Sequence, residues 1–366
     1  MSRAQEFLRP LVRDMPESEP ILSLERMRAE YGFAPDELVK LDANENPYGA
    51  LPEVREALEK LEAVHIYIYP DPECSALRQR LAQYHGVEQE RIVVGAGLDE
   101  VIDLIFRVCI DVGDRLLNCP PTFGMYAFDG AMHQARLVSV PRKADFSLDM
   151  DGIQKAVKAE QPKLLFLPNP NNPDGGLITT EEFRQLADLP LLLVMDEAYI
   201  QFCDQEQTVM DEVAKHDNLI VLRTFSKWAG LAGLRIGYGV FPLEIAAAIM
   251  KIKQPYNVST AAQLAATVTM DNIDKTVPVI TRIREQRQVL LNGLAQIDWL
   301  ESIPSQANFI LCRVKGKSAA TVADELRRQG IMVRCFDQPG LPNALRISVG
   351  TAEQMQKLLA ALKEMR

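Results

Sequence analysis

The chain has 366 residues, 47% of them hydrophobic, so it can bury a large core and is long enough for two domains. Its net charge of -10 excludes the basic field that nucleic-acid binding requires. Six scattered cysteines form no Cys-x-x-Cys pair, and none of the four histidines has a ligand-like partner at short spacing, so we expect free thiols and no metal site. Charged residues interrupt residues 1–16, and the longest apolar run, Leu189–Met195, is too short to span a bilayer. We therefore expect a cytoplasmic protein without a membrane partner.

The first part of the chain shows no core of its own. Prolines break residues 1–40 into short amphipathic pieces, which is typical of an arm laid over another structure. Residues 41–49 form a loop rich in side-chain amides and turn formers. Helices are predicted over Pro52–Leu61 and Ser75–His85.

From Arg91 onward, short apolar strands alternate with helices. The predicted strands begin at Ile92, Arg115, Lys163, Pro190 and Leu219, and the helices between them are Asp99–Ile110, Thr122–His133 and Thr180–Leu189. This alternation predicts an α/β fold with a mostly parallel sheet covered on both faces. Binding sites in such sheets gather at the strand ends.

Beyond Tyr238 the pattern is first helical and then mixed. Helices are predicted over Leu243–Gln254, Thr260–Asp271 and Val277–Ile297, followed by short strands and two more helices. This mixture indicates a second, smaller α+β domain. We predict an N-terminal arm with part of the small domain at 1–48, a large domain at 49–268 and a small domain at 269–366.

The segment Leu219–Gly239 brings an amine, two hydroxyls and a guanidinium into one glycine-rich turn. They belong to Thr224, Ser226, Lys227 and Arg235. Hydroxyls and a guanidinium suit a phosphate, and a neighbouring amine suits a Schiff base with a carbonyl compound. Pyridoxal phosphate is the obvious candidate, and a loop with a solvated lysine is the alternative.

Polar side chains also follow two other predicted strands. Asp196 ends an apolar strand, and a buried carboxylate there needs a partner such as a protonated ring nitrogen. Tyr199 and the amide of Asn172 are placed to reach a phenolic oxygen of the same ring. Capping, packing and turn formation are the respective alternatives.

Three further features fit the same ligand weakly when each is taken alone. A glycine pair precedes the free amides of Leu98 and Asp99 at a helix N-terminus, where a phosphate is favoured. Phe123 follows a strand and can stack on a flat ring, although a core aromatic is the usual case. Arg346 lies within an apolar strand, where it pairs either with a substrate anion or within its own domain.

Taken in order, these motifs resemble those of the fold-type-I pyridoxal-phosphate-dependent aminotransferases. The resemblance runs from about Leu41 to Gly350. It rests on Leu41–Pro47, Tyr69–Asp71, Asn171–Pro173, Asp196–Tyr199, Ser226-Lys227 with Gly230–Gly237, Pro255–Val258, Pro304–Phe309 and Leu345–Gly350. It implies a three-layer sandwich with a smaller α+β domain. Within this family the chain is similar to the histidinol-phosphate aminotransferases.

The resemblance also implies a role for each candidate residue. Lys227 would form the Schiff base, Asp196 would face the ring nitrogen, and Tyr199 would contact the ring oxygen. The cofactor-binding residues would be Tyr69, Leu98, Asp99, Phe123, Asn172, Asp196, Tyr199, Thr224, Ser226, Lys227 and Arg235. The substrate-binding residues would be Asn44, Tyr69 and Arg346. Tyr69 would come from the neighbouring subunit, so the resemblance implies a homodimer with shared active sites.

The implied reaction transfers the amino group of L-histidinol phosphate to 2-oxoglutarate, giving imidazole acetol phosphate and L-glutamate. An aromatic amino acid aminotransferase, a pyridoxal-dependent decarboxylase of a phosphorylated amino acid and a cofactor-free binding protein remain alternatives. The chain departs from the family at residues 19–23 of the arm, where a Tyr-x-Pro-Gly motif is absent. It also departs at Phe123, at Asp174 and at Trp228, which is bulkier than the usual residue after the lysine.

Overall fold

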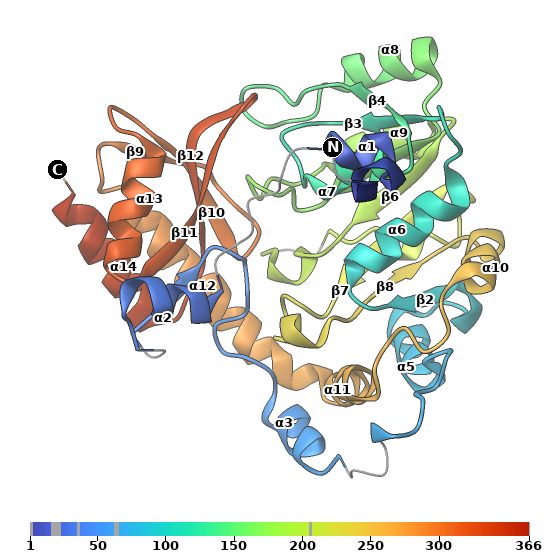
Figure 1. The fold of residues 1–366 in the computed structure, drawn as a ribbon, viewed down its shortest axis with the longest axis horizontal. Helices are drawn as coiled ribbons and strands as arrows, with labels where there is room; N and C mark the ends of the chain where they lie inside the picture. Colours follow the sequence, from blue (N-terminus) through green and yellow to red (C-terminus); the bar gives the residue numbers. More distant parts are fainter. Residues whose placement is uncertain (1–2, 16–22, 35–36, 62–65, 205–206, 366) are drawn as a thin grey trace.

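The computed structural model describes residues 3–15, 23–34, 37–61, 66–204 and 207–365, which form two sheets with helices packed around them (Figure 1). The departing arm segment at residues 19–22 lies outside the described residues. Strands of the first sheet, in spatial order, are β2 (Ile92–Gly95), β8 (Gly237–Val240), β7 (Leu219–Thr224), β6 (Leu192–Asp196), β5 (Leu164–Pro168), β3 (Arg115–Asn118) and β4 (Arg136–Ser139). Strands of the second sheet are β1 (Val39–Leu41), β11 (Ile331–Gln338), β12 (Leu341–Ser348), β10 (Phe309–Val314) and β9 (Leu300–Ser302).

The first sheet is mostly parallel, with one antiparallel strand. β4, β3, β5, β6 and β7 run parallel to one another, whereas β8 is antiparallel to both β7 and β2. All residues of β5 and β7 are buried, which explains the apolar run that fills β5 and the first four residues of β7. The predicted α/β class is therefore confirmed.

The helices around the first sheet match most of the predicted positions. They are α3 (Pro52–Glu59), α5 (Ser75–His85), α6 (Leu98–Cys109), α7 (Met125–Met132), α8 (Met150–Glu160), α9 (Thr180–Ala187), α10 (Leu243–Ile252) and α11 (Thr260–Asp271). The prediction placed the start of α7 at Thr122, but the proline pair Pro120-Pro121 keeps the chain irregular up to Gly124. The sequence patterns also missed β4 and α8.

The second sheet carries its own helices and captures part of the N-terminal arm. Its helices are α2 (Leu24–Tyr31), α12 (Val277–Leu294), α13 (Ala319–Arg328) and α14 (Ala352–Glu364), while the short η1 (Arg3–Phe7) and α1 (Pro10–Arg13) precede them in the chain. β1 pairs in parallel with β11, with Val39 opposite Ile331. We propose residues 49–268 as the large domain, and residues 1–48 and 269–366 together as the arm and the small domain. The pairing of β1 with β11 supports this division, because it joins the first segment to the last in one sheet.

The fold brings the ends of β5, β6 and β7 and the start of α6 to one edge of the first sheet. β12 of the second sheet faces this edge (Figure 1). Among the helices of the described residues, none combines the length and the apolar character needed to cross a membrane.

Candidate active site

A pocket of about 390 Å³ lies between the two sheets. Most of the predicted site residues line it, and they come from distant parts of the chain. These residues are Asn44, Leu98, Asp99, Phe123, Asn172, Asp196, Tyr199, Thr224, Ser226, Lys227, Arg235 and Arg346. The fold therefore brings together nearly all of the residues that the sequence motifs single out.

Lys227 follows β7 and extends its amine into this pocket. Its Nζ donates a hydrogen bond to the backbone oxygen of Ala43 at 2.9 Å and lies 5.9 Å from the centre of the Tyr199 ring. Burial, reinforced by the positive charge of Arg346, lowers the pKa of Lys227 to about 8. About a tenth of the amine is thus neutral, and nucleophilic, at pH 7, far more than for a lysine with an ordinary pKa.

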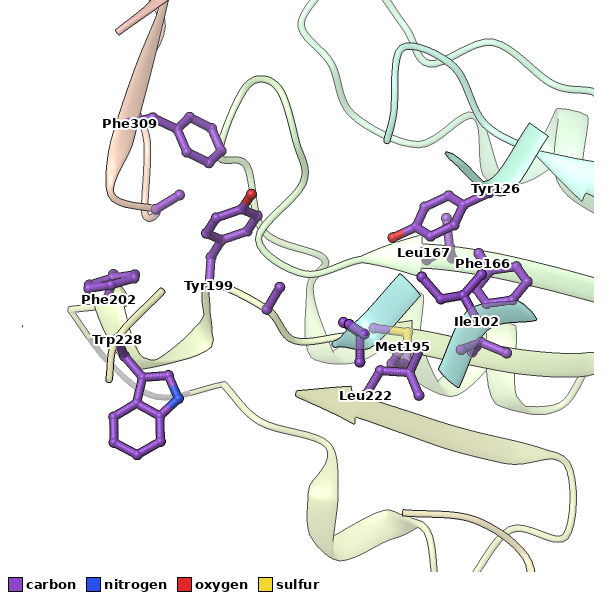
Figure 2. Packing of buried hydrophobic residues seen from close by; sticks show 14 of the residues in the cluster. Ile102, Tyr126, Phe166, Leu167, Met195, Tyr199, Phe202, Leu222, Trp228 and Phe309 are labelled. Atoms are coloured by element: carbon purple, nitrogen blue, oxygen red, sulfur yellow. The ribbon is translucent and has the colours of Figure 1, made fainter. Parts of the chain in front are cut away.

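Asp196 is held at the end of β6 by two donors. The Tyr126 hydroxyl donates to its Oδ2 at 2.7 Å, and the backbone N–H of Ala198 donates to its Oδ1 at 3.0 Å. Burial raises the pKa of Asp196 to about 6. Figure 2 shows the Tyr126 hydroxyl directed toward the loop that carries Tyr199. The two donors therefore orient this carboxylate, but the described residues supply no cation that would offset its burial.

Sequence reasoning missed Tyr126. The residue sits on α7 three positions after Phe123, and its ring stacks on Phe166 of β5 with centroids 4.9 Å apart. A tyrosine on a largely apolar helix is indistinguishable from a core residue at the level of sequence. Only the fold shows that its hydroxyl contacts Asp196.

One end of the pocket offers backbone amides. α6 begins directly after Gly97 without a side-chain cap, so the amides of Leu98 and Asp99 open onto the pocket. Gly97 has φ +85°, and a Cβ there would lie 2.3 Å from a guanidinium nitrogen of Arg235. The Arg235 Nη2 donates to the Asp99 carboxylate at 2.8 Å. This end has the positive helix terminus and the guanidinium that an anion requires.

The opposite end is formed by Arg346 of β12. Its Nη1 donates to the Asn172 side-chain oxygen at 2.7 Å, and its Nη2 donates to the backbone oxygen of Asp42 at 2.8 Å. Its buried Nε has no hydrogen-bond partner within the described ranges of the chain. Burial lowers the pKa of Arg346, and its guanidinium lies 5.4 Å from the Phe309 ring centre. Because no carboxylate of the described residues lies at hydrogen-bond distance, this buried cation is suited to an anionic ligand.

Asn44 lies in the loop after β1, and its side chain is hydrogen-bonded to both Tyr199 and Ser348. Its Nδ2 donates to the Tyr199 hydroxyl at 3.1 Å, while its Oδ1 accepts from the Ser348 hydroxyl at 3.0 Å. Its φ of +55° is a left-handed conformation that asparagine tolerates better than most residues. Asn44 therefore connects β12 of the second sheet to the pocket wall formed by Tyr199.

Tyr69 is the one predicted site residue that does not line the pocket of its own chain. It is 75% exposed and stacks on Tyr256 with ring centroids 4.4 Å apart. Its proposed role in a neighbouring subunit stays a prediction.

A second arginine near Arg346 was also missed. Arg334 of β11 is paired directly opposite Arg346 of β12, so both side chains lie on the same face of the second sheet. Their guanidinium carbons lie 6.0 Å and 5.8 Å from the centre of the Phe336 ring. Only the strand register shows that the two cations are neighbours.

No three His, Cys, Asp or Glu side chains of the described part of the chain are grouped as metal ligands. Comparison with known proteins then decides the family. The model of the family "Aminotransferase class I and II" matches residues 36–362. The chain belongs to the class I and II aminotransferases. The family resemblance drawn from the motifs is thereby confirmed.

Individual members of this aminotransferase family match the chain along almost its whole length. The chloroplastic histidinol-phosphate aminotransferase of Nicotiana tabacum is 46% identical over 358 residues, covering 98% of this chain and 86% of that protein. The histidinol-phosphate aminotransferase of Roseiflexus castenholzii is 45% identical over 364 residues, covering 98% of both chains. The crystal structure of the Sinorhizobium meliloti histidinol-phosphate aminotransferase, in complex with pyridoxal-5'-phosphate, superposes with a TM-score of 0.88 at 30% identity, covering 100% of this chain and 97% of that one.

Proposed function

We propose that this protein uses pyridoxal phosphate to transfer the amino group of L-histidinol phosphate to 2-oxoglutarate in histidine biosynthesis. The products are imidazole acetol phosphate and L-glutamate. The observation that carries the substrate is the 45–46% identity, over nearly the full chain, to relatives named histidinol-phosphate aminotransferases. No observation on this chain favours the aromatic aminotransferase, the decarboxylase or the cofactor-free binding protein.

The residues of the pocket fit pyridoxal phosphate. A phosphate would be held by the amides of Leu98 and Asp99, the hydroxyls of Thr224 and Ser226, and Arg235. Asp196, whose buried carboxylate is hydrogen-bonded but has no cation of the described residues as a partner, would receive the charge of a ring nitrogen. Phe123 would cover the ring, and Asn172 and Tyr199 would contact its phenolic oxygen. When bound, the cofactor supplies an electron sink for the negative charge that develops on the substrate carbon.

The catalytic steps assigned to the protein centre on Lys227. Its amine would anchor the cofactor covalently and, once released, would accept the proton from the α-carbon of the amino donor at Nζ. A pKa of about 8 suits this task, because efficient proton transfer requires a pKa close to the working pH. The Ala43 carbonyl orients the amine, and the Tyr199 ring limits its movement.

The end of the pocket at Arg346 would determine which amino donor and which amino acceptor the protein uses. We assign the anionic group of each substrate to Arg346, whose Nε has no protein partner, with Asn44 completing the wall. Arg334, beside it on β11, would supply a second positive charge. Two adjacent guanidinium groups suit a phosphate, which carries more charge and more acceptor oxygens than a carboxylate.

A homodimer with shared active sites is part of the same proposal. Tyr69 stands at the end of an exposed apolar run, Ile66–Tyr69, in which every side chain is at least 52% exposed. Such a run suits burial against a second copy. If Tyr69 completes the partner's site, mixing the inactive variants Tyr69→Ala and Lys227→Ala should restore activity through mixed dimers that keep one intact site. Mixtures that stay inactive although mixed dimers form would contradict shared sites.

The cytoplasm is proposed as the location. The support is limited to the cysteines, all of which are free and most of which are buried, as expected in a reducing compartment.

A panel of amino donors with 2-oxoglutarate tests the substrate assignment, with glutamate formation as the readout. We expect L-histidinol phosphate to give the highest kcat/KM. A preference for phenylalanine or tyrosine would instead identify an aromatic aminotransferase. Carbon dioxide release without glutamate would identify a decarboxylase.

A further inference from the structure

Glu45 lines the active-site pocket but belongs neither to the groups assigned to the cofactor nor to those assigned to the substrate anion. It lies in the loop after β1, two positions beyond Ala43, whose backbone oxygen accepts from the Lys227 Nζ at 2.9 Å. Burial and Arg346 lower the pKa of Lys227, and the negative charge of Glu45 acts on that pKa in the opposite direction. Glu45 therefore stands beside the point where the amino donor reacts.

The charge of Glu45 is only partly neutralised by its neighbours. Lys40 donates to the Glu45 Oε2 at 2.9 Å and to the Asp42 Oδ1 at 2.9 Å, so one ammonium serves two carboxylates. The Asp42 side chain is 8% exposed, whereas the Glu45 side chain is 42% exposed. Of these two carboxylates, Glu45 is the one that a ligand in the pocket can reach.

The other lining residues without an assigned role offer no side-chain acceptor. The Tyr126 hydroxyl is already hydrogen-bonded to Asp196, and the remaining residues of this group are apolar: Ala43, Ile102, Pro168, Ala198 and Ala232. Histidinol phosphate carries an amine, a phosphate and an imidazole ring, and the ring N–H requires an acceptor. Among the described side chains of the pocket, Glu45 is the acceptor left for it.

We propose that Glu45 accepts the imidazole N–H of the amino donor and thereby selects donors that carry this ring. The assignment rests on the proposed function, because it names a contact of the same substrate. A carboxylate forms a stronger hydrogen bond than a neutral acceptor, and it also favours the protonated imidazole. A benzene ring of similar size offers no N–H, so it gains nothing from this contact. Glu45 thus acts on the donor alone, whereas Arg346 serves both substrates.

The second substrate places the opposite demand on Glu45. 2-Oxoglutarate carries a second carboxylate and no hydrogen-bond donor, so the charge of Glu45 repels it. Loss of this charge should therefore harm the donor reaction and spare the acceptor reaction. A purely structural role, in which Glu45 only holds Lys40 and the loop at Ala43, would harm both reactions alike.

The variant Glu45→Gln separates these two roles, because it keeps the size of the side chain and removes its charge. The amino group passes first to the cofactor and then to 2-oxoglutarate, so each substrate has its own kcat/KM. For L-histidinol phosphate we expect kcat/KM to fall by about tenfold, the effect of one hydrogen bond to a charged group. For 2-oxoglutarate we expect kcat/KM to stay unchanged or to rise. Glu59→Gln, exposed on α3, is the control and should change neither value.

A second amino donor tests the same contact from the side of the ligand. The phosphate ester of L-phenylalaninol keeps the amine and the phosphate but has a benzene ring in place of the imidazole. We expect Glu45→Gln to leave its kcat/KM unchanged, so that the preference of the protein for L-histidinol phosphate over this donor shrinks by about tenfold.

The outcomes that would overturn the assignment differ from the one that would overturn the proposed function. A loss in Glu45→Gln that 2-oxoglutarate or the phenylalaninol ester shares would show that Glu45 acts through the loop. An unchanged kcat/KM for L-histidinol phosphate in Glu45→Gln would show that the imidazole does not contact this carboxylate. If the wild-type protein transfers no amino group from L-histidinol phosphate, the proposed function is wrong, and the assignment of Glu45 is wrong with it.

Discussion

The two ends of the active-site pocket are built in different ways. The end at Lys227 is assembled from residues that end or closely follow β6 and β7 or begin α6, so each is fixed by the strand or helix to which it belongs or that it adjoins. The end at Arg346 depends on contacts between distant segments, from Arg346 to Asn172 and to the backbone of Asp42. The residues assigned to the cofactor and to proton transfer, which every substrate needs, thus lie on the first sheet. The residues assigned to substrate recognition lie where the two sheets meet.

The contrast predicts that the two ends can be disabled separately. Lys227→Ala should lower turnover by ~10,000-fold or more, because the amine is both the covalent anchor and the proton acceptor. Noncovalent cofactor binding should persist, since the groups assigned to the phosphate and ring are unchanged. Steady-state kinetics and equilibrium dialysis of cofactor measure the two effects, with Lys158→Ala on the exposed side of α8 as the control. Near-normal turnover of Lys227→Ala would refute the mechanism.

At the other end, Arg346→Lys should lower kcat/KM for histidinol phosphate by ~100-fold while cofactor affinity changes little. Lysine keeps the charge but loses the planar fork that now contacts Asn172 and Asp42. Arg313→Lys, on β10 of the same sheet and half-exposed beside Glu301, is the matched control. A parallel loss of cofactor affinity would show that the two ends are not separable.

Sequence reasoning reached the first end more completely than the second. Lys227, Asp196 and the amides of Leu98 and Asp99 stand at element boundaries that apolar runs and glycines mark in the sequence. Arg334 escaped notice, because its position beside Arg346 depends on the register of two paired strands. β1 was missed, because it lies across the end of the predicted arm and the start of the predicted loop, and three residues are too few to show a strand pattern.

Tyr126 escaped notice for a related reason, although it belongs to the first end. Its contact with Asp196 spans 70 positions of the chain, and its ring fills the core beside Phe166. Side chains that act through another residue leave no local motif.

The Tyr126 contact allows a finer test of the Lys227 end. Its hydrogen bond lowers the pKa of Asp196 against the larger upward effect of burial. Tyr126→Phe should therefore raise this pKa and weaken cofactor binding by ~2-fold at pH 7 and by up to ~10-fold below pH 6, because a protonated carboxyl cannot pair with a charged ring nitrogen. The pH below which cofactor affinity falls should move upward by about one unit. Tyr31→Phe on α2 is the control, and an unchanged pH profile for Tyr126→Phe would show that the tyrosine only packs.

The smallest expected effect concerns the stability of the cofactor-free protein. The pKa of Asp196 is raised from 3.8 to about 6 in the folded state, so this carboxyl favours folding fully below pH 3.8. That contribution is lost as the pH rises and is gone above about 6, where the Asp196 side chain is ionised in both the folded and the unfolded protein. Asp196→Asn should accordingly stabilise the cofactor-free fold by ~1–3 kcal/mol at pH 8 and much less at pH 4.5.

Urea denaturation of the cofactor-free protein at both pH values measures this difference, with the exposed Asp298→Asn as the control. Equal effects of Asp196→Asn at pH 8 and pH 4.5 would show that the carboxylate carries no burial cost. The predicted pattern instead makes Asp196 a residue that destabilises the empty pocket and becomes favourable only when a cation is brought to it. At the Lys227 end a charged group is therefore buried before the ligand binds, at a cost in stability. A core selected for stability alone would not contain such a group.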